Sequence, residues 1–479
     1  MVFCIDVRSE VFRRHLESLD GSIETFGFAG FFGMSLEYQP LGSTQGVAQC
    51  PVLLQPAFQV PERPLGANTA TSENIARKHR VRQQGKALWQ LFQTSATSCF
   101  SFVESLGLGF FAKLAGDSVK SSSPPIRWPW IPAKKPPKVP LGPDLSPTDR
   151  SGLPETSRID LVESLLRNLG MRQGFAPLVV LCGHATELTN NPYRAALDCV
   201  ACGGHSGEPN ARVAATLLNE ETVQKGLKDR NIEIPQDTWF VAAVHNTTTD
   251  GVTLCDTHLV PASHKALVDE ITGWFGQAGQ LARRERAARL GEQGENQLPR
   301  RGRDWAEVRP EWGLAGNAAL IVAPRSRTRG LDLGGRTFLH SYDHSQDQDL
   351  RVLELIMTAP MVVANWINMQ YYASTVDPKT FGSGNKTIHN VVGRFGVLQG
   401  NGGDLMTGLP MQCVHDGKRL QHEPLRLLVV IEAPRDAVSQ VILKHAVVRN
   451  LVTNGWVTLV VLDGGRTMRW TSMGEWVEA

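Results

Sequence analysis

Long hydrophobic runs, excess charge and cysteine are all scarce in this sequence. It has no run of about 18 or more uncharged apolar residues, so a membrane-spanning helix is not expected. The 49 basic and 47 acidic residues leave a net charge of +2, which gives no reason to expect nucleic acid as a partner. Eight cysteines in 479 residues are too few for a disulfide scaffold, and we expect a reducing cytoplasm. The remaining composition, 42% hydrophobic and 20% charged, is that of a globular protein.

The order of the apolar segments predicts an α/β fold with a mostly parallel sheet and flanking helices. Continuous apolar runs at 177–182 and 239–244 are typical of parallel strands buried on both faces. Near the end of the chain, the pattern predicts a strand at 425–431, a helix at 436–451 and a strand at 457–462. Such alternation favours parallel strands joined by helices. No internal repeat is visible in the sequence.

Cysteine, aspartate and arginine alternate near the start of the chain, as Cys4, Asp6 and Arg8. Residues 1–8 read as a strand, and a helix follows as far as Gly21. Alternate residues of a strand share one face, so we expect the three side chains to face one cavity. Cysteine and aspartate are zinc ligands, and arginine can hold a carboxylate through two hydrogen bonds. The segment therefore predicts a switchable metal site.

A second group of metal-binding residue types begins at His184, just beyond the predicted strand at 177–182. Ligand sites in α/β sheets lie at the carboxyl ends of strands, where Cys4 is also expected. We favour a site that His184 and Cys199 share with Cys4 and Asp6. The Cys199-x-x-Cys202 spacing leaves two alternatives open. One is a closed structural zinc site with His184 and His205, and the other is a pair of buried thiols without metal.

Four other segments have a distinctive composition. The Gly- and Phe-rich segment 26–33 indicates either tight packing under a loop or the wall of an apolar cavity. Residues 121–150, with nine prolines, predict an extended linker or insertion. Residues 281–303, rich in Arg, Glu and Gly, predict an exposed helix and loop, whereas 366–372 predicts a buried helix with polar tethers.

The chain resembles the DabA-type inorganic carbon transporter subunits of bacteria in many blocks that occur in the same order. They are 3–10 (FCIDVRSE), 24–33 (ETFGFAGFFG), 49–51 (QCP), 182–184 (CGH), 190–193 (NNPY), 198–204 (DCVACGG), 309–319 (RPEWGLAGNAA), 338–343 (FLHSYD), 358–363 (TAPMVV), 366–372 (WINMQYY) and 389–393 (HNVVG). Members of this family are also expected to carry a further N-terminal region that this sequence lacks.

The resemblance implies a core like that of β-carbonic anhydrases, with large insertions. It implies Zn²⁺ bound by Cys4, Asp6, His184 and Cys199, with Arg8 as the partner that draws the Asp6 carboxylate off the metal. It further implies a membrane-embedded, antiporter-like partner of the DabB type, and a peripheral location on the cytoplasmic face of the inner membrane. The implied function is conversion of CO₂ to bicarbonate, coupled to a cation gradient.

The same resemblance suggests how the chain is divided. Residues 1–120 and 151–265 would form the two parts of the zinc-site core, on either side of the linker at 121–150. Residues 266–310 would be a charged helix and linker, and 311–479 a C-terminal α/β region. Two other functions remain open at this point. One is a stand-alone β-type carbonic anhydrase, and the other is a zinc-stabilised scaffold without chemistry of its own.

Overall fold

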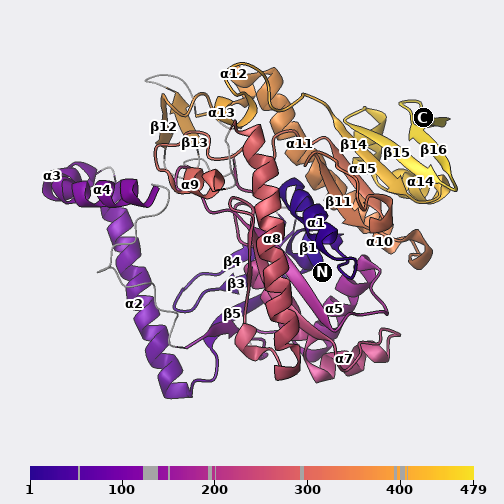
Figure 1. Ribbon diagram of the computed structural model, residues 1–479, viewed down its shortest axis with the longest axis horizontal. Helices are drawn as coiled ribbons and strands as arrows, with labels where there is room; N and C mark the ends of the chain where they lie inside the picture. The colour runs from indigo at the N-terminus through magenta and orange to yellow at the C-terminus, as the bar shows by residue number, and fades with distance from the viewer. Residues whose placement is uncertain are drawn as a thin grey trace.

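The computed structural model describes most of the chain. The described residues are 1–51, 54–95, 97–121, 139–148, 151–191, 197–199, 201–291, 296–392, 396–399, 405–406 and 408–479. Most of the linker predicted at 121–150 lies outside them. Within them the chain is a mixed α/β protein, as the sequence predicted, but it has two large sheets and not one (Figure 1).

The first large sheet has five strands in the order β2-β1-β7-β8-β9. Its first four strands are parallel, and β9 runs antiparallel to β8. The strands are β1 (Val2–Cys4), β2 (Phe26–Phe28), β7 (Leu178–Ala185), β8 (Trp239–Asn246) and β9 (Gly251–Leu254). The two parallel strands predicted from continuous apolar runs are thus confirmed as β7 and β8.

Helices cover both faces of this sheet, which explains why its strands are apolar throughout. On one face, Phe3 and Val180 pack with α1 (Val7–Leu19) and α8 (Lys265–Arg289). On the other face, Cys4 and Leu181 pack with α5 (Glu155–Leu169), α6 (Glu208–Leu218) and α7 (Glu221–Lys228). Figure 1 shows α8 running down the centre of the molecule beside α1.

The second large sheet has the order β11-β10-β14-β15-β16-β17. Its strands are β10 (Ala319–Ala323), β11 (Thr337–Ser341), β14 (Leu427–Glu432), β15 (Val457–Asp463), β16 (Arg466–Trp470) and β17 (Trp476–Glu478). Four parallel strands are followed by an antiparallel one, and the chain visits the first five positions in the same order as in the first sheet. The first half of the chain, which contains the first sheet, and the second half, which contains the second sheet, therefore share a topology, although no repeat is visible in the sequence.

The helices of the second half pack against one face of its sheet in a single hydrophobic core. They are α10 (Arg351–Thr358), α11 (Pro360–Val376), α14 (Arg435–Lys444) and α15 (Ala446–Thr453). The single helix predicted at 436–451 is thus two helices, because His445 is extended and hydrogen-bonds Glu354 at 2.8 Å. Among the described residues, the stretch Arg351–Val376 is long and apolar enough to cross a membrane, but half of the window that qualifies is buried.

Smaller elements surround the two large sheets. A four-stranded sheet contains β3 (Leu36–Gln39), β4 (Val47–Gln49), β5 (Phe58–Pro64) and β6 (Leu141–Pro143), and a hairpin contains β12 (His389–Val392) and β13 (Gly396–Gln399). The remaining α-helices are α2 (Thr69–Thr94), α3 (Cys99–Leu106), α4 (Phe110–Ser121), α9 (Gln297–Arg303), α12 (Pro378–Phe381) and α13 (Met411–Val414).

The predicted exposure of residues 281–303 is wrong in part. Ala282 and Ala287 of α8 are buried, and the guanidinium of Arg286 reaches inward to Asp250 at 2.6 Å. The charged composition suggested a solvated helix. The small alanines, however, let one face of α8 pack closely, and the long Arg286 side chain reaches a buried ion pair.

The two large sheets meet at their edges, where β2 lies beside β11. Gly27 N donates to Ser341 Oγ at 2.9 Å, and Arg13 Nη1 of α1 donates to Leu339 O at 3.2 Å. A Cβ atom on Gly27 would lie 1.8 Å from that same carbonyl oxygen. Glycine is therefore required for this close approach, which joins the two halves of the molecule.

We expect Gly27→Ala to lower the free energy of unfolding by about 1–3 kcal/mol, because the added methyl group would force the two sheet edges apart. Gly21→Ala is the matched control, since nothing lies within 4 Å of its Cβ position. Chemical denaturation of both variants measures the difference. Equal stabilities would show that the edge contact is not tightly packed.

Candidate metal centre

The segment from Cys4 to Arg8 is a strand end followed by a helix start, and not one continuous strand as the sequence predicted. Strand β1 stops at Cys4, and Asp6 is the N-cap of α1. The Asp6 side chain accepts a hydrogen bond from Arg8 N at 2.9 Å. Aspartate is among the preferred N-cap residues, so the helix begins after Asp6 and the strand does not continue to Arg8. Arg8 therefore lies in the first helical turn and not on the face of a strand.

Arg8 and Asp6 nevertheless form a buried pair with two side-chain hydrogen bonds. Arg8 Nε and Nη2 lie 3.0 and 2.9 Å from the two carboxylate oxygens. Burial alone would raise the pKa of Asp6, but the charge and hydrogen bonds of Arg8 hold it well below its ordinary value. Asp6 is therefore an ionised carboxylate with both oxygens engaged.

A third residue of this network, Glu311, was not identified from the sequence. Its Oε2 accepts hydrogen bonds from Arg8 Nη1 at 3.2 Å and from Arg286 Nη2 at 3.3 Å. The Glu311 side chain is buried, and Arg8 Nη1 also reaches Leu197 O at 3.1 Å. Glu311 lies within the block 309–319, which was the only available signal, because no sequence spacing relates residues about 300 positions apart.

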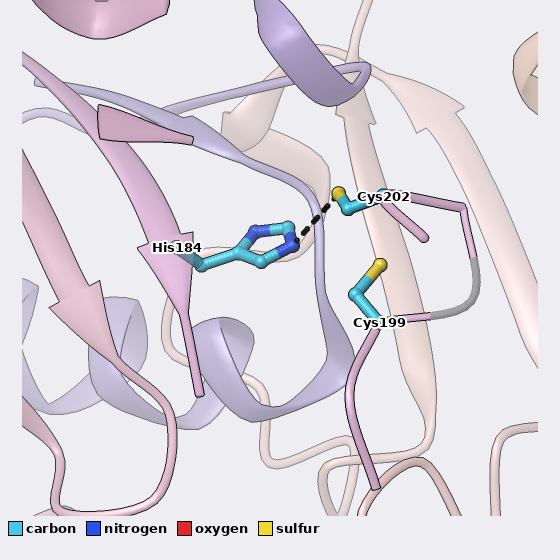
Figure 2. A group of neighbouring side chains, drawn as sticks. All are labelled: His184, Cys199 and Cys202. Carbon is cyan, nitrogen blue, oxygen red and sulfur yellow. Dashed lines mark hydrogen bonds between the residues drawn. The ribbon is translucent and has the colours of Figure 1, made fainter. Parts of the chain in front are cut away.

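At the carboxyl end of β7, His184 forms a buried cluster with Cys199 and Cys202. Their ligand atoms all lie within 4.8 Å of one another, and Cys202 Sγ is 3.3 Å from His184 Nε2. Figure 2 shows the imidazole directed at the two sulfur atoms. The backbone N–H groups of Cys202 and Gly204 both donate to Cys199 O, and this turn brings the two sulfurs to one side. The structure thus joins His184 to both cysteines of the CxxC.

The cluster has the charge distribution of a metal-binding site. The hydrogen bond from Cys202, followed by that from His184, lowers the pKa of Cys199 well below its ordinary value despite burial. Burial would lower the pKa of His184, but its hydrogen bond to Cys199 and the charge there raise it. Within the described part of the chain, the buried His184 Nδ1 has no hydrogen-bond partner. Thiolates and imidazole are donors that zinc prefers, so the residues fit such an ion.

Cys4 and Asp6 are not members of this cluster, which consists of His184, Cys199 and Cys202. Burial raises the pKa of Cys4 to about 12, against hydrogen bonds from the backbone N–H groups of Phe31 and Phe32. The charge of Cys199 acts on Cys4, and that of His184 acts on Asp6. The four residues implied by the resemblance thus interact electrostatically, with Asp6 held by Arg8.

The backbone beside Cys4 is strained. Phe31 and Phe32 have φ values of 61° and 52°, in the left-handed region that bulky residues rarely adopt. Each such residue costs on the order of 1–3 kcal/mol and persists only where its surroundings hold it. Here the conformation is accompanied by the two N–H contacts to the Cys4 sulfur.

An apolar cavity of about 280 Å³ opens onto the cluster. Phe28 and Phe31 of the Phe-rich segment line it, whereas Phe32 is fully buried in the core. Both interpretations of segment 26–33 therefore hold, for different residues. The opposite wall comes from the second half of the chain, through Phe338, His340, Ile356, Val363 and Ile367. The cavity is complete only because the two sheets meet at their edges.

We expect Glu311→Gln to lower the free energy of unfolding by roughly 3 kcal/mol, because it leaves Arg8 and Arg286 buried with one carboxylate fewer. Glu285→Gln is the matched control. That carboxylate also pairs with an arginine, Arg14, but it is partly exposed, so a loss below about 1 kcal/mol is expected. Urea denaturation measures both values, and equal effects would contradict a special role for Glu311.

The chain is similar to known proteins over its whole length. The profile of the family described as "Probable inorganic carbon transporter subunit DabA" matches residues 1–457. This chain is 52% identical to a protein of the same description from Rhodopirellula baltica and 50% identical to one from Bradyrhizobium sp. (strain BTAi1). Both alignments span 100% of this chain, and they cover 54% and 58% of the two relatives. One from Chloroflexus aurantiacus is 49% identical over 96% of the chain and 56% of its own length. The chain thus spans about half the length of these relatives. No solved structure matches.

Proposed function

The chain belongs to the DabA family of probable inorganic carbon transporter subunits, and on that premise we propose that it binds zinc and converts CO₂ to bicarbonate within an energy-coupled pump. The observation that carries this proposal is the buried cluster of His184, Cys199 and Cys202 at one end of an apolar cavity. Thiolate and imidazole donors suit zinc, and an apolar cavity suits a small uncharged gas.

The proposed zinc ligands are Cys4, His184 and Cys199, with Asp6 as the fourth when Arg8 releases it. The family resemblance favours Cys199 over Cys202 as the ligand thiolate. A hydrogen bond between the two buried sulfurs lowers the pKa of Cys199 and raises that of Cys202. Cys202 would then serve as a thiol donor that supports the ligand.

The roles of the surrounding residues follow from their positions. Bound zinc supplies Lewis acidity, which lowers the pKa of water to about 7 and so provides a nucleophile at neutral pH. Phe28, Phe31 and Phe338 would hold CO₂ in a dry environment. Arg8 would keep the Asp6 carboxylate away from the metal position, and the ionised Asp6 would orient the nucleophile through a carboxylate oxygen.

Energy coupling would require a membrane-embedded, antiporter-like partner, with this chain bound peripherally at the cytoplasmic face of the inner membrane. We propose that ion movement through the partner alters the hold of Arg8 on Asp6, and so makes hydration effectively one-way. Glu311 would transmit this effect, because it contacts Arg8 from the second half of the chain. The chain spans about half the length of its relatives, and the coupling concerns the complete assembly.

A second candidate function is a zinc-stabilised scaffold for the same complex. It is favoured by the proximity of Cys202 to His184 and Cys199, because three protein donors and a fourth nearby would close the site to water. In that case metal would be needed for stability and not for chemistry.

We expect about one zinc ion per purified chain, lost in Cys4→Ala and His184→Ala but retained in Cys202→Ala. Elemental analysis of the three variants decides between the ligand sets. Full zinc in Cys4→Ala together with zinc loss in Cys202→Ala would move the site to His184, Cys199 and Cys202, and would favour the scaffold.

We expect Arg8→Lys to retain zinc but to stop bicarbonate accumulation, because a lysine ammonium cannot bind both Asp6 oxygens in the way a guanidinium does. The measurement pairs zinc content with growth in ambient air of a carbonic-anhydrase-deficient bacterium that expresses the full complex. Asp20→Asn, at an exposed helix end, is the control and should grow normally. Normal growth with Arg8→Lys would contradict the role of Arg8, and loss of zinc would make Arg8 a structural support of the site.

A further inference from the structure

A helical arm, residues 69–95 and 97–121, stands at one side of the molecule. Figure 1 shows α2 along the left edge, with α3 and α4 at its upper end. The 26 residues of α2 correspond to a length of about 39 Å. The arm is anchored part-way along α2, where Gln83 Nε2 donates to Leu41 O at 3.2 Å, and near its end, where Trp305 Nε1 donates to Ser118 Oγ at 3.2 Å.

The end of the arm exposes large apolar side chains on several neighbouring elements. We define this apolar tip as Phe100 and Val103 of α3, Leu108 of the following turn, and Phe111 and Leu114 of α4. Phe100 is 78% exposed and Leu108 95% exposed. Monomeric soluble proteins rarely present so many large apolar side chains together, and such patches mark interaction sites.

The helices that carry these exposed side chains are held together by a separate small aromatic core. Phe102 is buried among Trp89, Phe92 and Phe110, with ring centroids 5.3–5.5 Å apart and edge-to-face geometry. This aromatic cluster fixes α3 and α4 to the end of α2. The exposed residues therefore project outward from a braced structure.

Cationic side chains lie on α2, on the N-terminal side of the apolar tip. Helix α2 contains five basic residues and one acidic residue, Glu73. All five basic side chains are exposed; they are Arg77, Lys78, Arg80, Arg82 and Lys86. Along the arm, positive charge thus comes first and exposed apolar surface follows.

We propose that the helical arm docks on an anionic lipid bilayer, with the apolar tip in the interface and the α2 cations near lipid phosphates. Basic residues next to Phe, Trp and Leu side chains are typical of interfacial helices. A bilayer suits the tip better than a protein groove does, because the exposed residues lie on three successive elements instead of one helical stripe. This contact is independent of the proposed chemistry, since neither the metal site nor the cavity takes part.

The test is co-sedimentation of the full chain with vesicles of phosphatidylcholine alone and of phosphatidylcholine with phosphatidylglycerol. We expect binding to the anionic vesicles, weaker at high salt. The double variant Phe100→Asp/Leu108→Asp should lower the partition coefficient at least about tenfold. Met473→Asp, which changes a side chain 86% exposed outside the arm, is the control and should bind normally.

A second pair of variants tests the charge. Arg82→Glu/Lys86→Glu should weaken binding to anionic vesicles, whereas Arg351→Glu, at an exposed position outside the arm, should not. Two results would overturn the proposal. One is equal vesicle binding by the tip variant and the unaltered chain. The other is absence of vesicle binding with tip-dependent self-association in light scattering, which would make the tip a protein-docking surface. Neither result would bear on zinc content.

Discussion

The Arg8 guanidinium connects three parts of the chain within the protein interior. It holds both oxygens of Asp6, the carbonyl of Leu197 and the carboxylate of Glu311. A buried arginine needs such partners, because an unpaired charge in the interior is costly. The same contacts tie the start of α1, Leu197 and Glu311 of the second half to one point. The state of the candidate metal centre therefore depends on both halves of the molecule.

The shared topology of the two large sheets gives this dependence a structural basis. The first half contributes the potential ligands, and the second half contributes one wall of the cavity. Their edges meet at Gly27 and Leu339, where only a glycine allows the approach. A chain cut between the halves would leave the cavity open to water, and a dry cavity is what the proposed chemistry requires. The second half is thus part of the site without supplying a metal ligand.

The sequence predicted those features that depend on local pattern. Continuous apolar runs identified β7 and β8. The sequence predicted His184 just beyond a strand, and the structure places it in the last two residues of β7, at the carboxyl end where the site forms. The alternation of Cys4, Asp6 and Arg8 led to a wrong strand assignment, since an N-cap and a strand can share the same residue types. Glu311 and the inward-facing Arg286 could not be predicted, because their partners are distant in sequence and no local period encodes them.

X-ray absorption spectroscopy of the zinc-loaded chain tests the central proposal most directly. Zn–S bonds of about 2.3 Å are resolved from Zn–N and Zn–O bonds of about 2.0–2.1 Å, so the sulfur ligands can be counted. With Cys4, His184 and Cys199 as ligands, the spectrum should require two sulfur and two nitrogen or oxygen scatterers, and both sulfurs should remain in Cys202→Ala. Three sulfur scatterers, or the loss of one sulfur in Cys202→Ala, would bring Cys202 into the coordination sphere and would contradict a site that Arg8 and Asp6 can open.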